Sequence, residues 1–117
     1  MAFRFESLEI WKESVGFSKI IYVTAKSFPK EELFSLVDQL KRASVSISAN
    51  IAEGSGSVSD KDFKNYLNIS IKSIFEVVSL LAIAEQNTYI SNEDFVKLRS
   101  KAEVLVKRIQ AFRNSLK

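Results

Sequence analysis

The chain has 117 residues, of which 46% are hydrophobic and 26% are charged, and it has a net charge of +3. This length predicts a single domain, residues 1–117, that can bury a core without metals or disulfides. The absence of cysteine and histidine excludes thiol nucleophiles, disulfides, zinc fingers and di-iron sites with histidine ligands. We therefore expect no catalytic activity and no metal or other cofactor.

The first predicted helix covers about residues 8–27. Leu8, Trp11 and later apolar or small residues up to Ala25 recur at steps of three and four, the period of a helix with one apolar face. Ser7 is the candidate N-cap. Pro29 is expected to end the helix, because the residue before a proline avoids helical backbone angles.

The second predicted helix starts at Pro29 and stops at Gly54. Proline suits the first helical position, where its missing N–H has no partner to lose. Glu31 and Glu32 would then lie in the first turn and complement the helix dipole. A polar stripe beside the apolar seam recurs at helical spacing and consists of Gln39, Arg42, Ser46, Asn50 and Glu53, with Gly54 at its end.

The polar stripe has two interpretations. In the first, it is structural and fixes helix register or a subunit contact, since polar groups at a packed border need partners. An Arg42–Glu53 ion pair, within or between subunits, is one candidate for such a contact. In the second, the stripe contacts a ligand directly. The residues that follow, 54–57, resemble half a phosphate loop but lack its lysine and the preceding strand, which favours a simple turn.

A repeated capping pattern marks the starts of the third and fourth helices. Ser59 and Ser91 are each followed three residues later by an aspartate, the spacing of a capping box. Two apolar staple pairs flank these caps, namely Val58 with Phe63 and Ile90 with Phe95. The turn between the two helices covers about residues 86–90. Short connections force successive helices to be antiparallel, so the predicted fold is an all-α, up-down-up-down four-helix bundle.

The third helix is more apolar than a single core-facing stripe requires. Between Tyr66 and Ala84 its only charged residues are Lys72 and Glu76, and a helix apolar nearly all round is expected to be buried on more than one side. We therefore expect a subunit interface formed by the first and third helices. The alternative is a wide core face with scattered exposed apolar residues. The expected interface residues are Ile10, Phe17, Ile21, Ile69, Phe75, Val78 and Ile83.

The sequence also favours a cytoplasmic protein. Residues 1–6 have no apolar run after a basic start and do not resemble a signal peptide. The weakly charged stretch from Ile74 to Ala84 is interrupted by Glu76 and is shorter than a bilayer span requires. We therefore expect no contact with a membrane.

Basic residues concentrate in the fourth helix. From Lys97 to Lys117 there are seven basic residues and one acid, Glu103. They form either an ordinary solvated face or a groove for nucleic-acid phosphates. The candidate phosphate-binding residues are Lys41, Arg42, Lys97, Arg99, Lys101, Lys107, Arg108 and Arg113.

Residues 38–54 carry a resemblance to a known family. Their core, Ser46-x-x-x-Asn50-Ile51-Ala52-Glu53-Gly54, resembles the signature of bacterial four-helix-bundle proteins encoded in intervening sequences of 23S ribosomal RNA genes. Other matching pieces extend the resemblance over nearly the whole chain. It implies a ring-like homopentamer without established catalytic activity. It also implies kinship with the accessory protein of diversity-generating retroelements, which is thought to bind nucleic acid and a reverse transcriptase.

Two functions follow from the residues and the resemblance together. The first is a non-enzymatic oligomeric bundle that binds RNA or another nucleic acid electrostatically, with affinity that falls steeply with salt. The second is a protein-interaction scaffold, in which the ring docks a partner protein such as a nucleic-acid enzyme.

Overall fold

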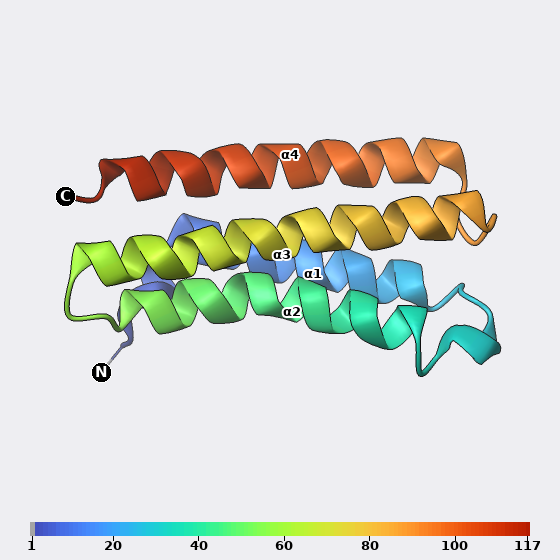
Figure 1. Cartoon of the computed structure of the whole chain (residues 1–117), viewed down its shortest axis with the longest axis horizontal. Coiled ribbons are helices and arrows are strands. Elements are labelled where there is room, and N and C mark those ends of the chain that lie inside the picture. Colours follow the sequence, from blue (N-terminus) through green and yellow to red (C-terminus); the bar gives the residue numbers. More distant parts are fainter. Residues whose placement is uncertain (1) are drawn as a thin grey trace.

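The computed structural model describes residues 2–117 and contains only helices in that range. Four long helices form the body, and they are α1 (Glu9–Ala25), α2 (Leu36–Ser55), α3 (Asp60–Gln86) and α4 (Asn92–Ser115). Two short 3-10 helices, η1 (Arg4–Ser7) and η2 (Lys30–Glu32), precede α1 and α2. The body measures 44 × 24 × 20 Å, and Figure 1 shows the colour sequence running in opposite directions along successive helices.

One continuous apolar core lies between the four helices. Each helix contributes side chains that are fully or almost fully buried, among them Ile21, Ile47, Leu81 and Ile109. Each helix packs against its neighbours along the chain, and α4 closes the bundle against α1 with the loosest of these contacts. Since α2 and α4 lie diagonally and have no close backbone approach, α1 or α3 lies between residues on these two helices.

Helices α2 and α3 pack more closely than any other pair, because small residues at their contact allow the two backbones to approach. The Ser70 hydroxyl is fully buried and donates to the Ile47 carbonyl at 2.8 Å. Gly54 is also buried, and a Cβ added to it would lie 2.6 Å from the Tyr66 Cβ. The two backbones approach because neither helix places a bulky side chain at these positions.

The caps of α3 and α4 confirm the predicted starts. Ser59 Oγ accepts from the Asp62 N–H at 3.1 Å, and Ser91 Oγ accepts from the Asp94 N–H at 3.0 Å. The predicted staple contact between Val58 and Phe63 before α3 is wrong, however, because Val58 is fully exposed while Phe63 is buried. Ile90, before α4, is buried in the core.

Three predicted boundaries are also wrong. Helix α2 begins at Leu36 rather than Pro29, because residues 30–32 form a separate 3-10 turn and Ser35 breaks the helical backbone with φ −125° and ψ −96°. Ser7 lies inside η1, where its hydroxyl donates to the Arg4 carbonyl, so it does not cap α1. Helix α2 continues past Gly54 to Ser55, and Gly56 is its C-cap.

Helix α3, with 27 residues, is the longest of the four long helices. It is the one helix in residues 2–117 that length and composition alone would allow to cross a membrane. However, 44% of its most apolar stretch is buried inside the bundle. This burial accounts for part of the apolar character of the helix.

Candidate interaction surfaces

The basic residues of α4 lie on two opposite flanks of the helix. On the α1 side, Arg108 Nη1 donates to Glu13 Oε1 at 2.9 Å, and Lys97 and Lys101 line the furrow between α4 and α1. On the α3 side, Arg113 Nη1 donates to Asn68 Oδ1 at 2.7 Å. Arg99 and Lys107 line a groove on that same side. The structure thus divides the predicted phosphate-binding set instead of gathering it.

Two of these cations have an acidic neighbour on their own helix. Lys97 pairs with Glu93 at 3.2 Å, and Arg99 approaches Glu103 at 4.0 Å. Both pairs are exposed, so each contributes little to stability and leaves the cation accessible. Lys101 and Lys107 form no ion pair within residues 2–117.

The two basic residues of α2 lie apart from this group. The Lys41 ammonium lies 5.0 Å from the centre of the Tyr22 ring, and Arg42 pairs with Asp38 at 3.0 Å. Because α2 is diagonal to α4, another helix separates Lys41 and Arg42 from the cations of α4. The Arg42–Glu53 pair suggested within the chain is wrong, since Arg42 reaches one turn back to Asp38 instead.

The polar stripe of α2 is partly absorbed by contacts within the bundle. Ser46 Oγ and Ser73 Oγ share a hydrogen bond of 2.9 Å between α2 and α3. Asn50 Nδ2 donates to the Ser46 carbonyl at 2.8 Å and to its hydroxyl at 2.9 Å. These bonds fit a structural role for the middle of the stripe. Gln39 and Glu53 are exposed, and a ligand contact by them stays a prediction.

The predicted subunit interface separates into two groups. Ile10, Phe17 and Ile21 on α1 are buried in the core of their own subunit, so their assignment to an interface is wrong. These three residues are spaced by seven and four positions and belong to the core-facing seam of α1. The seam that we predicted from the sequence lies one position away along the helix. On α3, by contrast, Ile69, Phe75 and Ile83 are exposed, and Val78 is half-buried.

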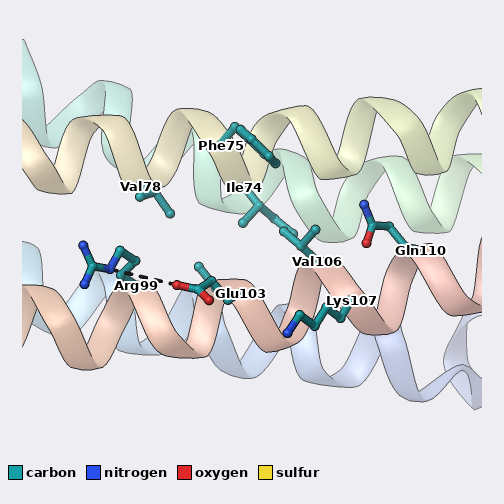
Figure 2. A pocket seen from close by; sticks show the side chains of 9 residues that line it. Ile74, Phe75, Val78, Arg99, Glu103, Val106, Lys107 and Gln110 are labelled. Carbon is teal, nitrogen blue, oxygen red and sulfur yellow. Dashed lines mark ion pairs between the residues drawn. The ribbon is translucent and has the colours of Figure 1, made fainter.

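An apolar groove lies between α3 and α4. Its floor is formed by Ile74 and Val78 from α3 and by Ala102 and Val106 from α4, and its volume is about 360 Å³. Figure 2 shows Ile74 and Val106 pointing toward each other between the two ribbons. Phe75, which is 65% exposed, stands at the edge of the groove.

The α4 side of the groove is polar and carries charge. Arg99, Glu103, Lys107 and Gln110 follow one another along this rim, and the dashed line in Figure 2 marks the Arg99–Glu103 pair. The groove therefore combines an apolar floor with a rim that carries two cations and one anion.

A second apolar feature, which the sequence analysis missed, lies at the end of the bundle. Phe34 is 90% exposed and Leu33 is 49% exposed. We call residues 31–34, which include these two and the acidic Glu31 and Glu32, the tip. The predicted helix from Pro29 includes these residues, and within it apolar residues at steps of three and four would face the core. Because the predicted start of α2 was too early, the exposure of Leu33 and Phe34 was not expected.

The tip is fixed by hydrogen bonds to Glu32. Ser35 Oγ donates to Glu32 Oε1 at 2.7 Å, and Tyr89 Oη, from the α3–α4 connection, donates to Glu32 Oε2 at 2.8 Å. These bonds, Ser35 first, lower the pKa of Glu32 from its usual value. The bond to the carboxylate raises the pKa of Tyr89. Glu32 is therefore negatively charged at neutral pH.

Residues 2–117 contain no group of three acidic side chains that could hold a metal ion. No curated protein matches the chain. The most similar solved structures include a protein of unknown function from the S23 ribosomal protein family of Bacteroides thetaiotaomicron. The two chains are 25% identical, and the alignment covers 91% of this chain and 99% of that chain with a TM-score of 0.82.

The family model described as 23S rRNA-intervening sequence protein matches residues 6–111. This match includes all four long helices up to residue 111, and therefore nearly the whole core. The chain belongs to the 23S rRNA-intervening sequence protein family.

Proposed function

We propose that this chain is a non-catalytic, cytoplasmic subunit of a ring-like homo-oligomer, in which each subunit is an up-down-up-down four-helix bundle. The resemblance noted in the sequence suggests five subunits. The observation that carries the assembly is the exposure of large apolar side chains on α3, namely Ile69, Phe75 and Ile83. Large exposed apolar patches on a protein surface often mark protein–protein contact sites.

We further propose that the assembly binds RNA or another nucleic acid through the α1 flank of α4. Lys97, Lys101 and Arg108 lie on that flank, where phosphates could approach from solvent. A single bundle offers only these few cations, but a ring repeats them once in every subunit and strengthens the local field. The affiliation with a family named for ribosomal RNA intervening sequences supports this ligand class.

A charge-reversal pair tests the nucleic-acid proposal. The variant Lys97→Glu/Lys101→Glu should weaken binding to a single-stranded RNA by about tenfold or more, and should reduce the slope of log K against log salt by about two. The matched control is Lys19→Glu/Lys26→Glu, which changes the net charge equally on two exposed positions of α1 and the turn after it. Equal losses in both variants, or affinity that does not change with salt, would contradict binding at this flank.

A second function, a scaffold that docks a partner protein, is favoured by the groove between α3 and α4. Its floor is apolar and offers nothing to a phosphate, whereas apolar side chains of a protein would fit it. Affinity purification after nuclease treatment distinguishes the two functions. A partner protein retained in stoichiometric amount without nucleic acid supports the scaffold, and retention of nucleic acid alone contradicts it.

A further inference from the structure

We propose that the tip of one subunit docks in the α3–α4 groove of the next copy of the chain. This inference rests on the proposed homo-oligomer and names the contact that would join its subunits. In this contact Phe34 and Leu33 enter the groove, while Glu31 and Glu32 face the cations on its rim. Four features of the structure support this pairing.

The first feature is the rigidity of the tip. Backbone hydrogen bonds run from the Glu32, Leu33 and Ser35 N–H groups to carbonyls three residues earlier. The Glu32 side chain is tied to both Ser35 and Tyr89. Phe34 is thus presented to solvent by a segment that is already ordered. The backbone that carries Phe34 therefore has little conformational entropy to lose when the side chain binds.

The second feature is the shape and chemistry of the groove. Its volume of about 360 Å³ is at the small end of ligand pockets, a size suited to one or two apolar side chains. Its floor residues Ile74, Val78 and Val106 offer no hydrogen-bonding side-chain groups. A phenylalanine and a leucine would therefore lose water there without leaving a polar group unpaired.

The third feature is complementary charge. Two carboxylates precede the apolar residues of the tip, and the hydrogen bonds to Glu32 lower its pKa further below neutral pH. Lys107 and Arg99 stand on the rim of the groove, and Lys107 has no ion-pair partner within residues 2–117. Opposite charges around an apolar contact favour this orientation of two copies over its reverse.

The fourth feature is the position of the two surfaces. The tip lies at one end of the bundle, in the connection between α1 and α2 (Figure 1). The groove is lined by residues midway along α3 and α4. One chain cannot bring its own tip to its own groove without unfolding. A contact between two different surfaces is head-to-tail, and such contacts close into rings when the rotation between subunits allows it.

Disulfide cross-linking tests the contact directly, because the chain has no cysteine of its own. In the double variant Phe34→Cys/Phe75→Cys, mild oxidation should join successive subunits and give a ladder of covalent oligomers. The control, Val58→Cys/Phe75→Cys, moves the first cysteine to a fully exposed position in the α2–α3 turn. All three positions are exposed, so these substitutions leave the core intact.

We expect the tip-to-groove variant to cross-link about tenfold faster than the control, and neither single-cysteine variant to form more than traces of dimer. Equal rates in the two double variants would overturn the docking contact. Sedimentation of the wild-type chain separates this result from failure of the assembly itself. If the wild type is oligomeric but the two double variants cross-link at equal rates, the docking contact is refuted and the homo-oligomer is not. A monomeric wild type refutes both the docking contact and the homo-oligomer.

A charge exchange provides an independent measurement. Glu31→Lys and Lys107→Glu should each weaken self-association by about tenfold, and the double variant that carries both should recover most of the loss. Both side chains are exposed, so neither substitution threatens folding. A double variant as weak as the sum of the two single variants would show that these charges do not meet, and would overturn the pairing.

Discussion

The packing of Gly54 against α3 leads to a sharp stability prediction. Gly54 lies inside α2, where an alanine would be the better helix former by about 0.5–1 kcal/mol. However, the added Cβ would lie 2.6 Å from the Tyr66 Cβ and 2.8 Å from the Phe63 Cδ1. Carbon atoms prefer separations of about 3.5–4.0 Å. Because a Cβ is fixed to the backbone, Tyr66 cannot turn away, and α3 itself has to move.

The magnitude follows from these two opposing effects. Overpacking a core costs about 1–3 kcal/mol, and the upper half of that range applies when backbone must shift. After subtraction of the gain in helix propensity, Gly54→Ala should lower the free energy of unfolding by about 1–2.5 kcal/mol. Glycine to alanine is a conservative change. At this position, however, we expect the added methyl group to lower the free energy of unfolding more than at most other positions in the chain.

Gly16→Ala is the matched control. Gly16 also lies inside a helix, α1, but a Cβ added there would have no atom within 4 Å. Only the propensity effect remains, so this variant should gain about 0.5–1 kcal/mol. Urea unfolding followed by circular dichroism measures both, at one fixed protein concentration because self-association would add to apparent stability. If Gly54→Ala proves as stable as Gly16→Ala, the close approach of α2 and α3 is not as described.

Three further predictions concern hydrogen bonds. Ser70→Ala removes the buried bond to the Ile47 carbonyl at 2.8 Å and should cost about 1–2 kcal/mol in urea unfolding, because that carbonyl loses a buried donor. Ser59→Ala removes the cap of α3 and should cost about 1 kcal/mol, whereas Ser59→Asn should retain most of it. Tyr89→Phe removes a bond that lowers the pKa of Glu32. A carboxyl pKa that is lower in the folded state stabilises the fold above the pKa of the unfolded state, and this stabilisation is lost below the pKa of the folded state. The difference in melting temperature between wild type and variant should therefore shrink as pH falls from neutral toward about 3.

The four-helix composition could be predicted because it depends on local signals. The serine caps of α3 and α4 act through backbone N–H groups only three residues away, so the sequence specifies them completely. The apolar seam of α3 has a period that no other element type shares. These features need no knowledge of the rest of the molecule.

The features that escaped prediction depend on contacts between distant residues. Helix α2 starts late because residues 30–32 form a separate 3-10 turn and Ser35 leaves the helical backbone. Glu32 of that turn binds Tyr89, which lies 57 positions further along the chain, and no local pattern reveals such a partner. Gly54 looked like a helix stop because glycine often ends helices. Its actual role, close approach of two backbones, is visible only once α3 is placed beside it. The α1 seam was assigned one position away because apolar residues occur on both sides of the true core face.

The division of cations between the two flanks of α4 makes separate predictions for assembly and for nucleic-acid binding. If the tip occupies the groove, Arg99 and Lys107 are covered by a neighbouring subunit and are no longer free to meet phosphates. Lys97 and Lys101 then remain on the α1 flank as the accessible cations. Reversing the charge at Lys107 should therefore weaken self-association first, and lower RNA affinity only as far as the ring dissociates.

Reversing Lys97 and Lys101 should have the opposite effect and reduce RNA affinity in oligomers of unchanged size. Measurement of both properties on both variants separates the two flanks, because each variant serves as the other's control. A chain in which all four cations contributed equally to RNA binding, without any change in sedimentation, would show that α4 is a single solvated face. The apolar groove beside it would then have no neighbour to bind.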